Sequence, residues 1–158
     1  MVLHNIPPVF DENSKILILG SFPSVRSRET EFYYGHPQNR FWRVISVVFG
    51  AKVPETTDEK RALLLSNRIA LWDVIASCEI TGSADSSIKS VTANDLTAIF
   101  DSSSIERIYV NGKTAESYYK KLIEPKIGRK AVCLPSTSPA NAAYSLERLT
   151  EAWREIAE

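Results

Sequence analysis

The sequence predicts an α/β fold, a three-layer α/β/α sandwich around a central four-stranded, mostly parallel sheet. Four short segments are almost continuously apolar, as is typical of strands that are covered on both faces. Segments whose apolar residues recur at helical spacing lie between them. Strands that alternate with helices form parallel sheets, and their crossover connections are right-handed.

The expected strands are short runs rich in leucine and β-branched residues. None of them alternates between polar and apolar residues, so the sheet should lie in the interior of the protein. The four runs are Lys15 to Phe22, Arg68 to Ile75, Ile105 to Gly112 and Lys130 to Ser136.

Three helices are expected between the first three strands. Apolar residues at helical spacing predict one helix after Asn39 and another that begins at Thr57. Thr92 and Asp95 resemble a capping box, with Asp in place of the usual Glu or Gln. This pattern predicts a third helix that runs through Phe100.

Two more helices are expected in the C-terminal part of the chain. One carries apolar residues from Ala115 to Leu122, and Pro125 should stop it because proline disrupts a helix interior. The last should be capped by Ser145, whose hydroxyl can accept from a backbone N–H of the first turn.

Length and composition predict a single domain over residues 1–158. Apolar residues make up 44% and charged residues 24%, and no apolar run reaches the length of a membrane span. The N-terminus lacks the basic-then-apolar layout of a signal peptide, so we expect a cytoplasmic location, with nucleoid association in a prokaryote. Nineteen basic residues balance nineteen acidic ones. Nucleic-acid binding would therefore depend on a small local patch.

Cysteine and histidine are too sparse to predict a metal site. Cys78 and Cys133 are far apart in the sequence, and His4 and His36 are the only histidines. Two thiols cannot supply a four-cysteine zinc or iron–sulfur site, and buried reduced thiols are the simpler interpretation. We therefore expect neither a metal nor another cofactor.

Polar segments follow three of the four expected strands. They are Gly20 to Ser24, Asn111 to Lys113 and Pro135 to Pro139. Ligands of open α/β sheets bind beyond the carboxyl ends of the strands. The three segments should therefore meet at one edge of the sheet and form a binding site there.

The first of these segments leads into an aromatic loop with two interpretations. Gly20 to Ser24 is neither a GxGxxG fingerprint nor a P-loop, so it is a tight strand exit or a turn whose N–H groups face a ligand. Tyr33 and Tyr34 pack on the sheet or stack on a flat base. Asn39 either caps the next helix or acts in a site.

The C-terminal segment LPSTSPANA, Leu134 to Ala142, is rich in hydroxyl groups. Ser136, Thr137 and Ser138 could bind phosphate oxygens together with loop N–H groups. The alternative is an ordinary serine and proline turn.

Three separated motifs together resemble the uracil-DNA glycosylase superfamily. They are GSFPS with YYGHPQNRFW near the N-terminus, ALWDVIASCEITGSADSSI in the middle and LPSTSPANA near the C-terminus. The resemblance spans about Ser14 to Trp153, and it is closest to the DNA-deoxyinosine (hypoxanthine-DNA) glycosylase branch. The HPQNRFW element is also similar to the PxNRFW segment of mismatch-specific uracil/thymine glycosylases.

The resemblance implies Asn39 as the catalytic residue. The mismatch-specific branch has an Asn in its first motif, but Phe22 stands at that point here and cannot orient water. The deoxyinosine-type branch has its catalytic Asn in the HPxN segment, which is Asn39 in this chain. Asp73, Glu79 and Asp85 are possible helpers, and Asp85 is the best of them because its polar Gly/Ser loop is open. The alternative is a loop Asp that bonds its own backbone, so no role is assigned.

The resemblance also implies two groups of contacts with double-stranded DNA that contains a deaminated base. The expected base-binding residues are Gly20, Ser21, Phe22, Pro23, Ser24, Tyr33, Tyr34 and His36. The expected DNA-binding residues are Ser136, Thr137, Ser138, Pro139, Ala140, Asn141, Arg40 and Lys113.

The predicted activity is that of a monomeric DNA repair glycosylase that removes hypoxanthine without a metal or cofactor. A mismatch-specific uracil/thymine-DNA glycosylase is the near alternative. The alternative of another class is a nucleotide or nucleic-acid binding module without catalysis, which Phe22 in the first motif keeps open.

Overall fold

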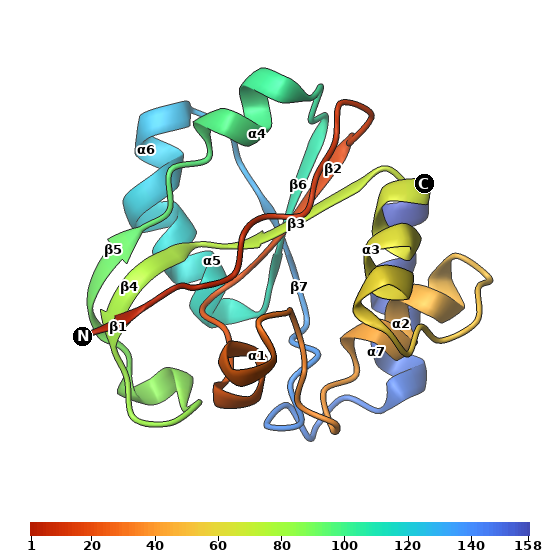
Figure 1. Ribbon diagram of the computed structural model, residues 1–158, viewed down its shortest axis with the longest axis horizontal. Helices are drawn as coiled ribbons and strands as arrows, with labels where there is room; N and C mark the ends of the chain where they lie inside the picture. The colour runs from red at the N-terminus through yellow and green to blue at the C-terminus, as the bar shows by residue number, and fades with distance from the viewer.

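A four-stranded parallel sheet lies between two layers of helices in the computed structural model, which describes residues 1–158 (Figure 1). The strand order is β3-β2-β6-β7, and every neighbouring pair is parallel. The predicted α/β/α sandwich is therefore confirmed. The strands are β2 (Ile16–Gly20), β3 (Ile69–Asp73), β6 (Arg107–Asn111) and β7 (Val132–Leu134).

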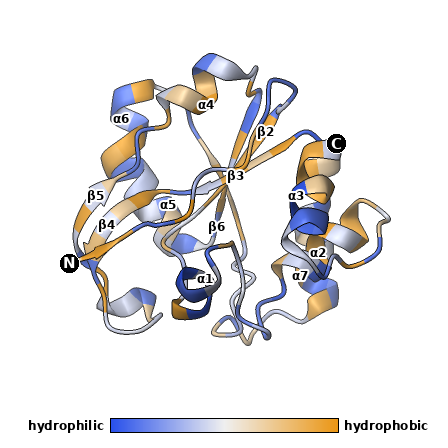
Figure 2. Ribbon diagram, in the orientation of Figure 1, coloured by the Kyte–Doolittle hydropathy of each residue, from blue (hydrophilic) through white to orange (hydrophobic).

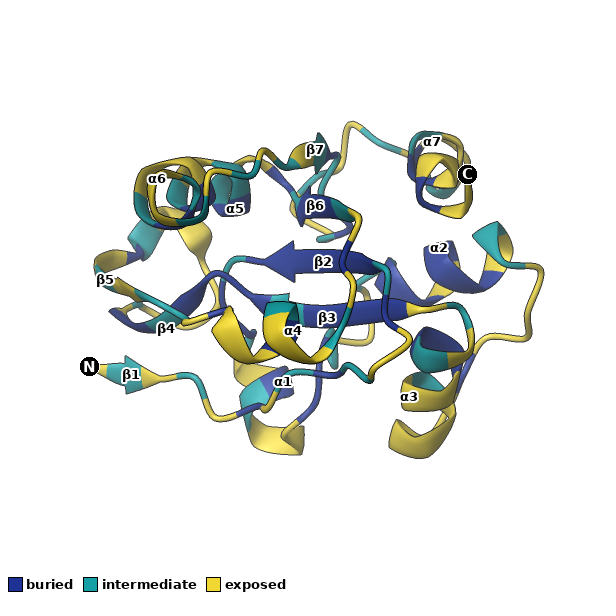
Figure 3. Ribbon diagram, turned by 90° about the horizontal axis from the view of Figure 1, so that it is seen from above, coloured by how far each residue is buried: buried dark blue, intermediate teal, exposed yellow.

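The central strands are apolar throughout because both faces of the sheet are covered. Ile16 and Ile18 of β2 pack into one hydrophobic cluster, and Leu17 and Leu19 pack into the other. In Figure 3, β2 and β3 are buried along almost their whole length. This two-sided burial removes the alternation that a half-exposed strand would show.

The helical layer on one face consists of α2 (Phe41–Val48), α3 (Thr57–Ser66) and α7 (Leu146–Trp153). Thr56 and Ser145 cap α3 and α7 by accepting from backbone N–H groups of the first turn, at 3.1 and 3.2 Å. The predicted cap at Ser145 is confirmed.

The other face is covered by a shorter helix, α4 (Thr97–Ser102), and by a continuous helical segment. That segment comprises α5 (Lys113–Tyr118), the π-helical turn η2 (Tyr119–Ile123) and α6 (Glu124–Ile127). The prediction that Pro125 stops the helix was wrong. Pro125 lies in the first turn of α6, directly after the π-helical turn, and the helical segment continues through it to Ile127.

The predicted capping box at Thr92 was also wrong. Thr92 belongs to strand β5 (Lys89–Ala93), and the helix begins only at Thr97. Asp95 is the capping side chain, because its Oδ1 accepts from the Thr97 backbone N–H at 2.9 Å. The Thr92–Asp95 pattern therefore lay close to the start of a helix, but the residue that caps it is Asp95 and not Thr92.

A second sheet, not expected from the sequence, extends the fold on the side of α5 and α6 (Figure 1). It is antiparallel in the order β1-β4-β5, with β1 (Val2–Leu3) and β4 (Ile75–Glu79) beside β5. The run expected to be one strand therefore divides at Val74 between two sheets. The Asn94 side chain holds this junction by donating to the carbonyls of Asp73 and Ile75.

The remaining elements are short. One of them, α1, is mostly hydrophilic, in contrast to the mostly hydrophobic strand β3 of the central sheet (Figure 2). No helix combines the length and the apolar character that crossing a membrane would need. The short elements are α1 (Val25–Thr30), η1 (Asp85–Ser87) and η3 (Arg154–Ala157).

Candidate active site

A cavity of about 540 Å³ lies where the strands β2, β3, β6 and β7 end. Its walls come from the segments that follow β2 and β7, with Asn111 at the end of β6 and Asp73 at the end of β3. The polar segments that the sequence placed after separate strands therefore lie together at the carboxyl edge of the sheet. The same edge includes α1 and the loop after β7 at the bottom of Figure 1.

Most of the sequence-predicted site residues line this cavity. They are Gly20, Ser21, Phe22, Pro23, Ser24, Tyr33, Tyr34, His36, Asn39, Ser136, Thr137, Ser138, Pro139 and Ala140. Arg40, Lys113 and Asn141 were also predicted but do not line it. Lining residues outside the predicted set are Ser27, Asp73, Ser83, Ala84, Asp85, Ser86 and Asn111.

The side-chain amide of Asn39 has one engaged end and one free end. Its Oδ1 accepts from the Phe41 backbone N–H and from the Thr137 hydroxyl, both at 2.9 Å. Its Nδ2 donates no hydrogen bond within the protein, and no buried side-chain nitrogen or oxygen lacks a partner. The amide nitrogen is therefore accessible at the cavity, while the oxygen supports the start of α2.

Asn111 connects Asn39 to the cavity wall through Thr137. The Asn111 amide nitrogen donates to Tyr34 Oη and to Thr137 Oγ1, and its oxygen accepts from the Thr137 backbone N–H, each at 3.1 Å. The next residue, Gly112, has a φ of 95°, and a Cβ there would come within 3.0 Å of the Ser136 Cβ. Glycine therefore allows the β6 and β7 exits to approach closely.

Arg40 fixes the loop after β7 in place. Its guanidinium donates to the backbone carbonyls of Thr137, Ser138, Asn141 and Tyr144. Most of the donors of this side chain are therefore used inside the protein. Arg40 therefore positions the loop after β7, whereas Lys113 is exposed at the start of α5.

The aromatic residues at the cavity differ in how far their rings are covered. Tyr33 is only 2% exposed, and its hydroxyl donates to the Pro7 carbonyl at 2.8 Å. Tyr34 stacks on Phe41 with ring centroids 4.0 Å apart, so one of its faces is already covered. Phe22 is 9% exposed and carries Arg28 over its ring. Phe22 and Tyr34 both line the cavity.

The cavity floor combines a phenol with a carboxylate. A Cβ on Gly20 would lie 2.9 Å from Tyr34 Oη and would overlap Asp73 Oδ1, so only glycine fits at this strand exit. Burial raises the pKa of Tyr34 far above its ordinary value, and the charge of Asp73 raises it further. The Tyr34 hydroxyl therefore stays protonated and can donate.

Asp85 lies at the mouth of the cavity, where its Oδ1 accepts from the Ser21 hydroxyl at 3.2 Å. The residue as a whole is exposed, but its carboxylate faces the loop, and this loss of solvation raises its pKa. Hydrogen bonds from Ser21 and Thr114 oppose that rise. No cluster of three or more His, Cys, Asp or Glu side chains is arranged to hold a metal ion.

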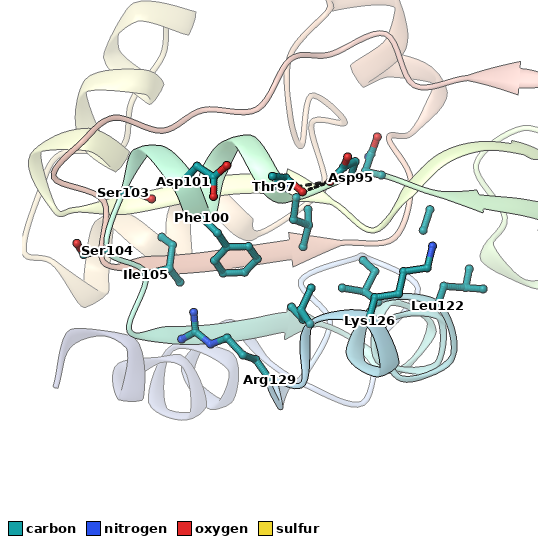
Figure 4. A pocket seen from close by; sticks show the side chains of 15 residues that line it. Asp95, Thr97, Phe100, Asp101, Ser103, Ser104, Ile105, Leu122, Lys126 and Arg129 are labelled. Carbon is teal, nitrogen blue, oxygen red and sulfur yellow. Dashed lines mark hydrogen bonds between the residues drawn. The ribbon is translucent and has the colours of Figure 1, made fainter.

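A larger cavity, of about 680 Å³, lies elsewhere, between α4 and the segment η2–α6 (Figure 4). It includes Ile105, just before β6, and so lies toward the amino ends of the strands. Two of its polar side chains support the fold, since Asp95 caps α4 and Arg129 lies over the Phe100 ring at 5.3 Å, and Asp101, Ser104 and Lys126 belong to exposed residues. We therefore place the candidate active site in the smaller cavity.

Comparisons with known proteins show which proteins this chain is similar to over its length. A solution NMR structure of a candidate uracil DNA glycosylase from Methanosarcina acetivorans covers 100% of both chains with a TM-score of 0.81 and 33% identity. A curated hypoxanthine DNA glycosylase from the same organism is 37% identical over 158 residues, which are 99% of this chain and 98% of the relative. One from Methanosarcina barkeri is 34% identical over 157 residues, 98% of each chain.

The family model of the uracil DNA glycosylase superfamily matches residues 7–157, which include every strand of the central sheet and every segment around the cavity. The resemblance carried by three short motifs thus extends over nearly the whole chain. The protein belongs to the uracil DNA glycosylase superfamily.

Proposed function

We propose that this protein is a DNA glycosylase that removes hypoxanthine from DNA by hydrolysing the N-glycosidic bond of a flipped-out nucleotide. The observation that carries the proposal is the Asn39 amide, which is fixed by Phe41 and Thr137 and has a free nitrogen at the cavity. Two relatives that match the full chain are named hypoxanthine DNA glycosylase, and this favours hypoxanthine over uracil or thymine.

Base excision requires that the nucleotide leave the helix and enter a pocket. Extrusion costs a few kcal/mol and is easiest for a mispaired base such as hypoxanthine opposite thymine. The cavity is open at the carboxyl edge, and Phe22 and Tyr34 offer apolar surface for a flat base. Backbone N–H groups of Phe22 and Ser24 donate no hydrogen bond within the protein. They are available to the O6 and N7 acceptors of the purine.

Asn39 is the group proposed to hold the attacking water. Because its oxygen is already engaged, the amide presents N–H donors, which hold a water molecule by its oxygen. The water oxygen bonds to C1′ as the C1′–N9 bond breaks, and the electron pair of that bond leaves with the base. The proton lost by the water goes to the departing base or to solvent. Donors around the base stabilise its developing negative charge.

The loop after β7 is proposed to contact the DNA backbone beside the flipped nucleotide. Ser136 and Ser138 contribute hydroxyls, and the Ser136 backbone N–H donates no hydrogen bond inside the protein. Pro139 and Ala140 are exposed at the tip of the loop, where they can approach the space left by the base. We propose that one copy of the chain acts on one lesion, since a single chain supplies all of these groups.

The test uses duplexes with a single inosine or a single uracil, followed by alkaline cleavage of abasic sites under single-turnover conditions. We expect strand breaks at inosine. Asn39→Ala should lower the excision rate by about 10²- to 10³-fold, the range for the loss of one positioned hydrogen-bond donor in an active site. Asn13→Ala is the matched control, because Asn13 is exposed at a turn before β2 and does not line the cavity.

Breaks only at uracil would replace the proposed substrate with that of the near alternative. DNA binding without breaks at either base would indicate a binding module. An Asn39→Ala protein that is less stable than the wild type but keeps full activity would show that Asn39 only supports the start of α2.

A further inference from the structure

His4 and Asp73 form a buried pair beside the cavity, and the function proposed above gives this pair no role. His4 Nε2 lies 2.8 Å from Asp73 Oδ2, and the two side chains are 3% and 5% exposed. The residues are 69 positions apart, so the pair brings the N-terminal segment to the end of β3. A buried carboxylate is costly unless hydrogen bonds compensate it, so the arrangement of its two oxygens matters.

The hydrogen bonds of His4 fix its tautomer. Its Nδ1 accepts from the Ile6 backbone N–H at 3.2 Å, so this nitrogen carries no proton. The proton of the neutral ring is therefore on Nε2, which donates to Asp73 Oδ2. Phe22 and Trp72 pack edge-on against the ring at 6.0 and 6.1 Å and hold its orientation.

The second oxygen of Asp73 has no partner in the protein. Oδ1 makes no hydrogen bond, yet it is not a buried unsatisfied atom, because Asp73 lines the cavity and this oxygen reaches its open space. Oδ1 also lies where a Cβ on Gly20 would project, next to Tyr34 Oη. A fixed hydrogen-bond acceptor is thus present on the floor of the proposed base pocket.

Deamination of adenine changes the hydrogen-bonding edge of the purine at two atoms. The amino donor becomes the O6 acceptor, and N1 changes from an acceptor to an N–H donor. We propose that the His4–Asp73 pair reads this new N1–H: Asp73 Oδ1 accepts it, and His4 acts as the positioning residue that keeps the other oxygen engaged. The inference rests on the proposed function, because it assigns a role within the same base pocket.

The same carboxylate disfavours undamaged adenine. Its oxygen would face the N1 lone pair of adenine, and two acceptors repel one another. A site built around one polar contact rejects a base that lacks the matching group far more strongly than an apolar pocket does. The negative carboxylate also opposes the charge that grows on the departing base, so its benefit should appear in selectivity and not in the absolute rate.

The test compares excision of hypoxanthine with excision of unsubstituted purine, supplied as 2′-deoxynebularine, which has a lone pair at N1. In Asp73→Asn, His4 Nε2 still donates to the side-chain oxygen, so the amide NH₂ faces the cavity and offers a donor. We expect the hypoxanthine-to-purine rate ratio to fall by about 10²-fold or more. The hydrogen bond to His4 is retained, so a purely structural pair would leave this ratio unchanged.

Two substitutions at His4 separate positioning from packing. His4→Phe keeps an aromatic ring but removes the donor to Asp73, and it should lower the hypoxanthine-to-purine ratio. His4→Gln can place a donor near the position of Nε2, and it should restore much of that ratio. Equal ratios in both variants and in the wild type would overturn the positioning role.

Binding provides a second measurement that does not depend on cleavage. Duplexes with the 2′-fluoroarabino forms of inosine and nebularine resist hydrolysis, and their relative affinities report how the base is read. We expect Asp73→Asn to reverse the preference of the wild type for inosine. If the wild type releases no hypoxanthine, the proposed function falls, and the affinity ratio still decides this inference. If the wild type releases hypoxanthine and Asp73→Asn changes neither ratio, only this inference falls.

Discussion

The two cavities at opposite ends of the sheet differ less in size than in how their polar groups are used. In the groove beside α4, Asp95 caps the helix, and Arg129 lies over Phe100 (Figure 4). The side chains there that have no partner, Asp101, Ser104 and Lys126, belong to exposed residues. In the cavity at the carboxyl edge, Asn39 Nδ2 and Asp73 Oδ1 have no partners inside the protein. The larger volume belongs to the groove, so volume alone does not identify the site.

This difference follows from the cost of leaving a polar group without a hydrogen bond. Side chains that only stabilise a fold are normally paired, because an unpaired buried group costs about 1–3 kcal/mol. A polar atom that is held rigidly and still lacks a partner is therefore suited to bind something from outside. The carboxyl-edge cavity has such atoms on rigid supports, since Thr137 and His4 orient the amide and the carboxylate.

Among the substitutions that test this comparison, Gly20→Ala should have the largest effect on inosine excision, because it fills the floor of the carboxyl-edge cavity. The new Cβ would overlap Asp73 Oδ1 and lie 2.9 Å from Tyr34 Oη, both on side chains held by hydrogen bonds. Forced repacking of this kind destabilises by about 1–3 kcal/mol. Inosine excision should fall by more than this loss of stability explains, as measured in single turnover well below the melting temperature. Full activity of the Gly20→Ala protein would mean that the flipped base does not reach the floor of the carboxyl-edge cavity.

Substitutions of Arg40 and Lys113 to Gln should separate loop positioning from phosphate contact. Each removes one positive charge, but only Arg40 donates to the carbonyls of the loop after β7. Arg40→Gln should lower the free energy of unfolding by about 1–3 kcal/mol, because carbonyls lose their donor. It should also slow excision and leave the salt dependence of DNA binding unchanged.

Lys113→Gln should give the opposite pattern. It should leave stability unchanged and reduce the slope of log affinity against log salt by about one, as expected for one lost phosphate contact. The measurements are chemical denaturation and binding of an inosine duplex at several salt concentrations. A reduced slope for Arg40→Gln would show that its guanidinium reaches the DNA after all.

The central sheet could be predicted from the sequence because its strands are buried on both faces. Runs such as Ile16–Gly20 are then apolar at every position and are readily recognised. The antiparallel sheet gave no such signal. β5 is largely exposed, so its residues do not form an apolar run. β4 follows β3 after a single residue, and β3 and β4 therefore look like one continuous strand in the sequence. The mistaken helix start at Thr92 has the same origin, because a polar edge strand resembles a helix start.

The site could be predicted in part, for a related reason. The rule that ligands bind at the carboxyl edge singled out the segment after β2 and the loop after β7. Asn39 was predicted only through the resemblance of the HPQN segment to the deoxyinosine-type branch. The roles of Arg40 and His4 arise from hydrogen bonds to residues as many as 104 and 69 positions away. Nothing near His4 indicates that it meets Asp73, and only the folded chain brings the two together.

The smallest effect is expected in the groove, where Arg129→Gln removes the cation over Phe100. The backbone carbonyl that accepts from the Tyr119 hydroxyl remains in place. The change should cost about 0.5–1 kcal/mol in the free energy of unfolding, the range of an exposed cation–π contact. Inosine excision and the affinity for an inosine duplex should equal those of the wild type, because the groove lies toward the amino ends of the strands. A fall in excision at unchanged stability would mean that a cavity with engaged polar groups still takes part in the reaction. The distinction between engaged and free polar groups would then no longer identify the site in this fold.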